Sequence, residues 1–224
     1  FLFFIVRNPS YLYYVAYLLC QMFAFSAWRG FGYQYIWPTW PIWNQISIMF
    51  FLGGTITFAL LFSIFFLEVR KHTPTLFYLM CISTFVGFGI MVSSFVGSYT
   101  LLLQACMIML IITVILNLTA GILAWKKGVH VARFYSFAWI IVASGFTMFA
   151  LNYTGIIPSN FVTENAAQIG ASIEVALLSM AFGSYFTEER KAKSKAQNQL
   201  LEKMREAYKA QAASAAKSEF LAKM

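Results

Sequence analysis

The sequence predicts an all-α fold: a bundle of membrane-spanning helices that continues into a charged helix. Three observations lead to this prediction. Of the 224 residues, 60% are hydrophobic and only 11% are charged, against ~25% charged residues in an average soluble domain. Several apolar stretches have the length of a membrane span. Nine of the 16 Lys and Arg residues follow residue 186, together with five of the eight Glu residues. This composition excludes a disordered chain, a disulfide scaffold and an ordinary cytosolic enzyme.

A transmembrane helix needs about 20 mostly apolar residues. The stretches that meet this length are residues 10–28, 45–67, 75–94, 101–125, 133–152 and 165–186. Residues 1–6 are apolar but too short to span a membrane, so we interpret them as the end of a first helix that begins earlier. We therefore expect a polytopic bundle of six full spans plus the end of a first helix.

The positive charges of the connecting loops alternate along the chain. Arg7, then Arg70 and Lys71, then Lys126, Lys127 and Arg133 fall in alternate loops, and the basic tail follows the last span. The loops of the other set carry a single cation, Arg29. Because Lys and Arg are enriched in cytoplasmic loops, we expect a multi-pass inner-membrane protein with a cytoplasmic C-terminus.

The segment 28–43 lies on the outer side in this topology and holds four of the six Trp residues. One interpretation is an aromatic belt, because amphipathic rings are favoured at the level of the lipid headgroups. The other is an extracytoplasmic surface for an unknown ligand or a partner, with Arg29 as a contact for an anion. The residues of this candidate surface are Arg29, Tyr33, Trp37 and Trp40.

The tail after Gly183 contains neither Pro nor Gly and is rich in Ala, Lys, Glu, Gln and Leu, which are strong helix formers. The last span is therefore expected to continue as one helix. A heptad spacing selects three large apolar residues, Leu201, Met204 and Tyr208, as a short dimer seam. A parallel homodimer and a solvated single helix both remain open.

Glu174 is the only carboxylate deep within the apolar stretches. An ionisable residue at this depth is costly and suggests a function, although it could also serve only to join helices. Small neighbours on its helix face, Gly170 and Ala171, predict that it points into the bundle. We expect a polar layer at the centre of the bundle that acts as an intramembrane switch, with Gln21 and Thr55 as the nearest partners of Glu174.

Other activities find little support. The last span contains no Lys for a retinal Schiff base, and a single carboxylate does not suit an ion pump. His72 and His130 lie in basic loops and are expected to be ordinary loop residues. No metal cluster, nucleotide-binding loop or catalytic site is recognisable in the chain. The basic tail is better explained by anionic lipid than by nucleic acid.

Two parts of the chain, the tail and the apolar region, contain runs that resemble known signalling proteins. The run AKSEFLAKM at 216–224 is similar to the opening of the dimerisation and phosphoacceptor helix of bacterial sensor histidine kinases. The runs SYLYY at 10–14, YIWP at 35–38 and GASIEVALLSMA at 170–181 resemble the bacterial seven-transmembrane receptors with diverse intracellular signalling modules. Together they imply a membrane sensor at 1–186, a signalling helix or coiled coil at 187–215 and the start of a kinase helix at 216–224.

The resemblance to histidine kinases also implies what lies beyond Met224. A phosphoacceptor His, a kinase domain that uses ATP and magnesium, and a response regulator or receiver domain as partner are expected there. The preferred function is thus the sensor and transmission region of a two-component sensor histidine kinase, with the catalytic activity in the full-length parent. The alternative is a membrane transporter or a scaffold protein with a helical tail.

Overall fold

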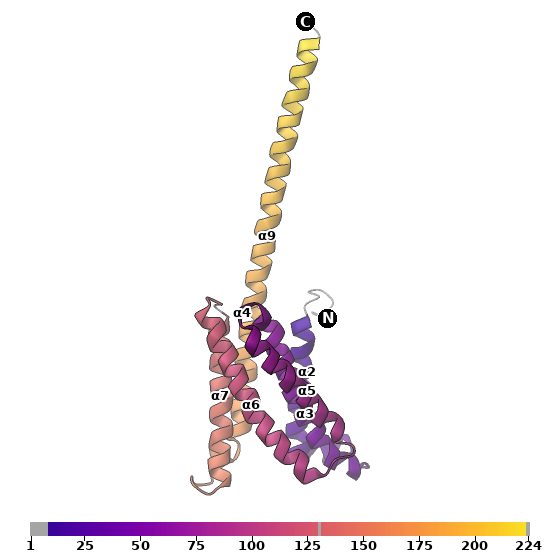
Figure 1. Ribbon diagram of the computed structural model, residues 1–224, viewed down its shortest axis with the longest axis vertical. Helices are drawn as coiled ribbons and strands as arrows, with labels where there is room; N and C mark the ends of the chain where they lie inside the picture. Colours follow the sequence, from indigo (N-terminus) through magenta and orange to yellow (C-terminus); the bar gives the residue numbers. More distant parts are fainter. Residues whose placement is uncertain (1–8, 130, 223–224) are drawn as a thin grey trace. The chain divides into compact units, whose positions relative to one another are not determined.

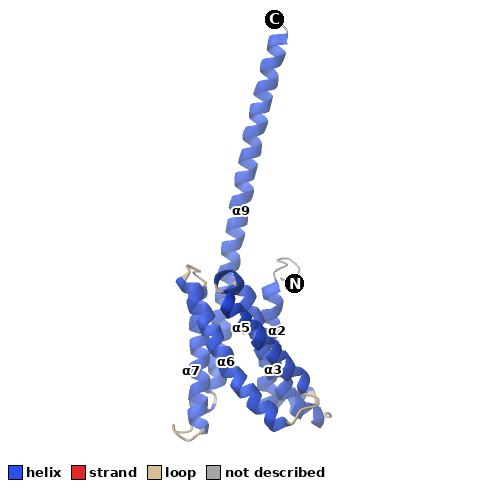
Figure 2. Cartoon of the chain, in the orientation of Figure 1, coloured by secondary structure: helices blue, strands red, loops and turns tan. Residues whose placement is uncertain are grey.

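A computed structural model describes residues 9–129 and 131–222. In this part of the chain every regular element is a helix, and loops join the helices (Figure 2), which confirms the predicted all-α class. In chain order the elements are α2 (Pro9–Trp28), the π-helical turn η1 (Gly32–Ile36), α3 (Pro41–Phe66), α4 (Val69–His72), α5 (Pro74–Ser93), α6 (Tyr99–Lys126), α7 (Ala132–Tyr153), α8 (Phe161–Glu164) and α9 (Ala166–Ala222).

Five helical stretches are long and apolar enough to cross a membrane: α3, α5, α6, α7 and the first part of α9, Ala166–Tyr185. They correspond to five of the six predicted spans. The sixth predicted span, 10–28, forms the 20-residue helix α2, which is not among the five. Four Tyr residues and Gln21 lower the mean hydropathy of α2, and several of these polar side chains lie inside the bundle.

Helix α3 is the centre of the bundle. It packs against α2, α5 and α6, and α6 in turn packs against α7 (Figure 1). The side chains of Ile56, Leu60 and Phe62 on α3 are completely buried. Helices α3 and α5 approach closely at Gly53 and Gly87, because a Cβ on Gly53 would lie 3.0 Å from the backbone oxygen of Gly87 and 2.7 Å from the backbone nitrogen of Met91. Such contacts between small residues are typical of helix pairs in membranes.

The ends of the helices follow from local sequence. Pro41 and Pro74 begin α3 and α5, where the missing N–H of proline is not needed and its fixed φ suits a helix. Gly30 follows α2 with φ of 80°, a left-handed conformation that glycine adopts without steric cost. The chain therefore turns sharply after α2 and enters η1.

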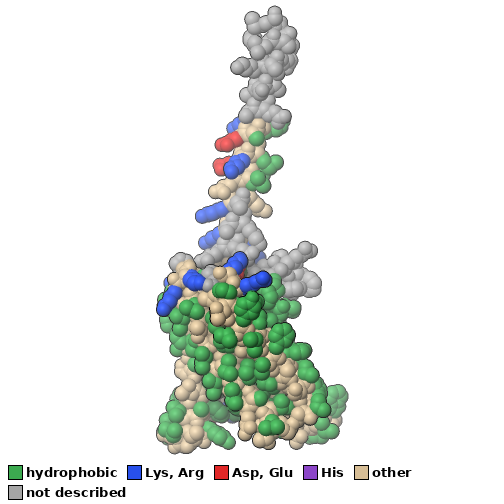
Figure 3. Space-filling view, viewed as in Figure 1, with side chains coloured by type: hydrophobic (Ala, Val, Ile, Leu, Met, Phe, Trp, Pro, Cys, Tyr) green, Lys and Arg blue, Asp and Glu red, His purple; other side chains and the backbone are tan. Residues whose placement is uncertain are grey.

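Four exposed cations of the bundle gather at one end (Figure 3), whereas Arg29, which is also exposed, follows the C-terminal end of α2. Arg70 and Lys71 belong to α4, Lys126 ends α6, and Arg133 lies in the first turn of α7. Apolar side chains cover the flank of the bundle beyond this basic end (Figure 3). The arrangement is that of a multi-pass membrane protein with one basic face.

The chain divides into two compact units between Ala181 and Phe182. The first unit is the membrane bundle and contains the first 16 residues of α9, Ala166 to Ala181. The second unit is the rest of α9, a charged helix in the part that is described. This boundary lies a few residues before residue 186, where the sequence analysis ended its first domain.

Candidate functional site

Glu174 is completely buried in the bundle, on the part of α9 that belongs to the first unit. Ala167 and Ala171, on the same side of α9, are also buried. On the described helices, no Lys or Arg lies in contact with the carboxylate. An ionised carboxylate buried in this way without a cation would be strongly destabilising.

The partners of Glu174 come from α2. The Tyr17 hydroxyl donates toward the carboxylate and lies 2.7 Å from Oε1 and 2.8 Å from Oε2. The Gln21 amide Nε2 donates to Oε2 at 3.4 Å. Tyr17 and Gln21 are four residues apart and therefore lie on one face of the helix. Each of them is at least nine-tenths buried.

Tyr14 lies on the same face of α2, one turn before Tyr17, and also contacts α9. The Tyr14 hydroxyl donates to the backbone oxygen of Val175 at 3.1 Å and lies 2.9 Å from the Ser179 hydroxyl. Helix α2 thus presents Tyr14, Tyr17 and Gln21 to α9 as a row of hydrogen-bonding groups. We call Tyr14, Tyr17, Gln21, Glu174 and Ser179 the glutamate cluster.

The structure brings Gln21 to Glu174 but not Thr55. The Thr55 hydroxyl donates to the backbone oxygen of Phe51, one turn earlier on its own helix, at 2.8 Å. Thr57, Thr84 and Ser144 also donate to the carbonyl four residues before them. These hydroxyls are satisfied locally, so they do not form one connected layer around Glu174.

Sequence reasoning missed Tyr17, which makes the shortest contact with the carboxylate. A signal was available, because four Tyr residues in one predicted span are unusual for a helix that faces only lipid. The spacing of Tyr14, Tyr17 and Gln21 at positions i, i+3 and i+7 places them on one helical face. This spacing predicts that Tyr14, Tyr17 and Gln21 form a polar face of the helix that packs inside the bundle.

A second buried polar cluster joins α3, α6 and α7. The Tyr135 hydroxyl donates to Oδ1 of Asn117 at 2.8 Å and makes a short hydrogen bond with the Ser63 hydroxyl. The single Ser63 hydroxyl proton can be donated to Tyr135 or to the backbone oxygen of Ala59, which lies 2.7 Å from the Ser63 oxygen, and Asn117 donates to the backbone oxygen of Thr113 at 2.9 Å. We call Ser63, Asn117 and Tyr135 the tyrosine cluster; all three are completely buried.

The ring of Phe62 lies between the two clusters. Its centroid is 5.1 Å from that of Tyr14 and 6.3 Å from that of Tyr135. An apolar ring thus separates a cluster that holds a carboxyl group from a cluster of neutral groups.

Helix α9 is held on another side by α7. A Cβ on Gly145 would lie 2.6 Å from the backbone oxygen of Ala166 and 3.2 Å from the Cα of Gly170. The two backbones touch here, so larger side chains cannot be accommodated without moving the helices. Close packing on α7 and hydrogen bonds to α2 together position Glu174.

The comparison with known families identifies the bundle. Residues 1–185 match the family described as 7TM diverse intracellular signalling. The chain belongs to this family. The 7TM diverse intracellular signalling domain is a membrane sensory domain associated with signalling. No curated protein and no solved structure matches the chain significantly.

The segment 28–43 of this 7TM domain is folded around Trp37. Trp37 is 9% exposed, and its indole N–H donates to Oδ1 of Asn44 at 3.2 Å. Its ring covers Gly32 so closely that a Cβ on Gly32 would lie 2.2 Å from the ring. A depression of about 390 Å³ opens beside it, lined by Ile36, Trp37, Pro38, Thr39, Trp40 and Trp43.

The other residues of the candidate outer surface have different surroundings. Trp40 and Tyr33 are 66% and 41% exposed. The Arg29 guanidinium donates to Oδ1 of Asn165 at 2.6 Å and to Oε1 of Gln168 at 3.1 Å. Arg29 therefore joins the C-terminal end of α2 to the start of α9.

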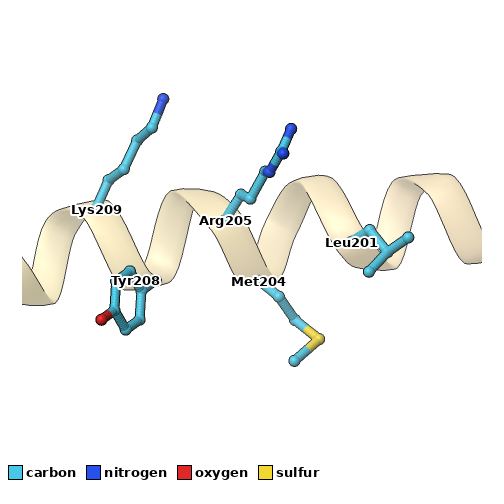
Figure 4. A pocket seen from close by; sticks show the side chains of 5 residues that line it. All are labelled: Leu201, Met204, Arg205, Tyr208 and Lys209. Atoms are coloured by element: carbon cyan, nitrogen blue, oxygen red, sulfur yellow. The ribbon is translucent and has the colours of Figure 1, made fainter.

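In the second unit, the residues of the predicted dimer seam lie on the surface. Leu201, Met204 and Tyr208 are 60%, 61% and 75% exposed. Figure 4 shows Met204 and Tyr208 on one side of the helix and Arg205 and Lys209 on the opposite side. They line a shallow depression with Leu201. The helix is thus amphipathic around these residues.

Proposed function

We propose that this chain is the sensor and signal-transmission region of a bacterial two-component sensor histidine kinase. The observation that carries the proposal is helix α9. It holds the buried Glu174 within the 7TM domain, and its sequence runs on to the stretch 216–224 that resembles a phosphoacceptor helix. In the proposed protein a change in the bundle reaches the kinase through this one helix.

The proposed topology has six full spans plus the end of a first helix in the bacterial inner membrane. Helix α2 counts as a span in this proposal, because Tyr14, Tyr17 and Gln21 face α9 and are hydrogen-bonded there. The basic end of the bundle and the charged tail are then cytoplasmic.

The proposed switch is the contact between α2 and α9. Because no cation of the described residues contacts Glu174, we propose that its carboxyl group is uncharged in the packed state. Separation of the two helices would cost the hydrogen bonds of the glutamate cluster, each worth roughly 0.6–2 kcal/mol in a membrane. Such an energy shifts a balanced two-state equilibrium several-fold. An input at the outer aromatic surface, from a ligand or from the membrane lipids, would act by favouring one packing.

The proposed output is a homodimer. The exposed stripe of Leu201, Met204 and Tyr208 supports pairing with a second copy, because three large apolar side chains on one helical face in water gain by burial. The full-length protein would bind ATP and magnesium in its kinase domain and pass phosphate to a response regulator or receiver domain.

Autophosphorylation of the full-length protein tests the assignment. Membrane vesicles that contain it are incubated with labelled ATP and magnesium. We expect label on a His shortly after Met224 and its loss when that His is replaced by Gln. A full-length protein without a kinase domain, or without transferable label, would contradict the proposal and favour a transporter or scaffold.

Labelling with an impermeant thiol reagent tests the topology. Single cysteines replace Lys126 and Trp40 in a chain without native cysteines. We expect position 40 to react from outside the cell and position 126 only after the membrane is opened. Reaction of both positions from the same side would overturn the topology.

A further inference from the structure

The basic end of the bundle is built from two short connections that are anchored to the helices. The first joins α3 to α5 and contains α4, which packs against α3, α5 and α6 (Figure 1). Leu67 and Val69 are 2% and 3% exposed and attach this connection to the bundle. Arg70 and Lys71 follow on α4 with exposed side chains. The fold therefore sets the positions of these two cations.

The second connection joins α6 to α7. Lys126 ends α6, and Lys127 follows it, both with exposed side chains. Val131 and Ala132 are buried again, and the exposed Arg133 comes next, in the first turn of α7. Because α4 also contacts α6, the cations of both connections belong to one surface, the basic end in Figure 3.

The two arginines of this end lie over aromatic rings. The guanidinium carbon of Arg70 is 5.9 Å from the centre of the Phe77 ring, and that of Arg133 is 4.9 Å from the centre of the Phe134 ring. Within the described part of the chain, neither guanidinium forms an ion pair or a hydrogen bond. Each arginine is thus held by a ring, and its planar fork of N–H donors is available to an oxygen ligand.

The carboxylates of the bundle do not balance the charge of this end. Glu68 pairs with Lys71, and its neighbours along the surface are cations. Glu164 accepts a hydrogen bond from Ser159, close to the start of α9, and Glu174 is buried against α2. These three are the carboxylates of the bundle among the residues that the structure describes. The basic end therefore calls for anions from outside the chain.

Lipid headgroups surround this end. Helices α3, α5, α6 and α7 are long and apolar enough to span a membrane, so their ends lie at the level of the headgroups. Trp125, which precedes Lys126, is 48% exposed, as is typical of aromatic residues at this level. The phosphate of an anionic lipid is an acceptor that a guanidinium binds through short, charge-assisted hydrogen bonds.

We propose that the basic end is a binding site for anionic phospholipid, in which Arg70, Arg133 and Lys126 bind headgroup phosphates. The inference concerns the bundle alone and depends neither on a kinase domain nor on a homodimer. It also goes beyond the charge bias that orients membrane proteins, which requires only cations in a loop. Here the cations stand on anchored segments, two of them over rings, so the bound lipid should remain on the protein in detergent.

Native mass spectrometry of the purified chain in detergent micelles tests the site. The chain is offered equal amounts of phosphatidylglycerol and phosphatidylcholine, and the lipids that stay bound are counted from the mass of the complex. We expect a several-fold excess of phosphatidylglycerol. One basic residue near an anionic lipid contributes about fivefold in binding, so Arg70→Gln combined with Arg133→Gln should lower the bound phosphatidylglycerol by about tenfold or more.

Two controls separate the site from the net charge of the chain. Arg205→Gln combined with Lys209→Gln removes two exposed cations from the second unit. Arg29→Gln removes the exposed cation that follows α2. Both controls should keep the excess of phosphatidylglycerol. A loss in either control as large as in the Arg70 and Arg133 pair would overturn the site, as would equal binding of the two lipids by the parent chain.

A conservative variant and a soluble anion complete the test. Arg70→Lys combined with Arg133→Lys keeps both charges and should retain most of the phosphatidylglycerol. A loss as large as in the Gln pair would show that these arginines support the fold of this end instead of binding lipid. Inorganic phosphate in large molar excess should leave the bound phosphatidylglycerol in place. Its displacement by phosphate would assign the site to a soluble anion and overturn the lipid.

Discussion

The glutamate cluster and the tyrosine cluster both use a buried tyrosine hydroxyl to join helices. Tyr17 is 2% exposed and Tyr135 is completely buried. The Tyr17 hydroxyl contacts a carboxyl group on α9, whereas the Tyr135 hydroxyl contacts an amide on α6 and a hydroxyl on α3. The same side chain thus works in two different chemical settings.

The difference lies in what each cluster connects. Ser63, Asn117 and Tyr135 are neutral and join helices that begin and end within the bundle. Glu174 can gain or lose charge, and α9 continues into the second unit of the chain. Two clusters that are equally buried can therefore have different roles. The tyrosine cluster is suited to stabilising the packing of the bundle, and the glutamate cluster is suited to changing the packing of α9.

The largest effect is expected from Glu174→Leu. It leaves the Tyr17 hydroxyl and the Gln21 amide buried without an acceptor, at a cost of about 1–3 kcal/mol each. Basal autophosphorylation of the full-length protein should change by roughly tenfold or more. Glu174→Gln, which keeps a hydrogen-bonding group of the same size, is the matched control and should stay close to the parent. Equal activity of both variants and the parent would remove Glu174 from the mechanism.

Tyr17→Phe is expected to have the next largest effect. It removes a single hydroxyl and leaves the carboxyl group with Gln21 alone. At up to ~1.7 kcal/mol for one hydrogen bond in a membrane, basal activity should shift up to about tenfold, in the same direction as in Glu174→Leu. A shift in the opposite direction would show that the two residues do not act through one contact.

Tyr135→Phe deletes the same atom in the other cluster. The loss of a buried hydrogen bond should lower the free energy of unfolding by about 1–2 kcal/mol, measured by denaturation in detergent micelles. Basal autophosphorylation should remain that of the parent, because α9 is not part of this cluster. If Tyr135→Phe shifted the output as much as Tyr17→Phe, the two clusters would form one unit and the comparison would fail.

Gln21→Leu is expected to have the smallest effect. Its amide lies 3.4 Å from Oε2, which is long for a hydrogen bond, so the change should be about 0.6 kcal/mol or less and about threefold or less in basal activity. Thr55→Val should have no measurable effect, because Thr55 bonds only its own helix. A larger effect of Thr55→Val than of Gln21→Leu would favour the partner predicted from sequence over the one that the structure places there.

Depth in the membrane predicts one partner of Glu174, Gln21, but it also selects Thr55 and does not reveal Tyr17. Counting residues from each end of a span placed Gln21 and Thr55 at a similar depth. It did not show that the Thr55 hydroxyl reaches the carbonyl of Phe51, as short hydroxyl side chains in helices commonly do. The longer side chain of Tyr17 crosses the gap between two helices, and its position on the face shared with Gln21 aims it at α9.

The aromatic segment 28–43 shows a similar limit of sequence-based prediction. Its wealth of aromatic residues predicted either a belt or a surface for a ligand. The structure separates the residues: Trp37 is packed on Gly32 and bonded to Asn44, whereas Trp40 is exposed. This division depends on the π-helical turn η1, which composition and spacing do not reveal.

The sequence by itself determined that the chain is an α-helical membrane protein, which stretches are apolar, where the cations gather and that one carboxylate lies deep among them. These properties follow from the cost of placing charge and unpaired backbone groups in lipid, and that cost acts on each segment separately. Only the tertiary structure decided that Glu174 meets Tyr17, that Gly145 meets Ala166 and that Tyr135 joins three helices. Those choices depend on which helices are neighbours and how they are rotated, because contacts between helices arise from the packing of whole faces.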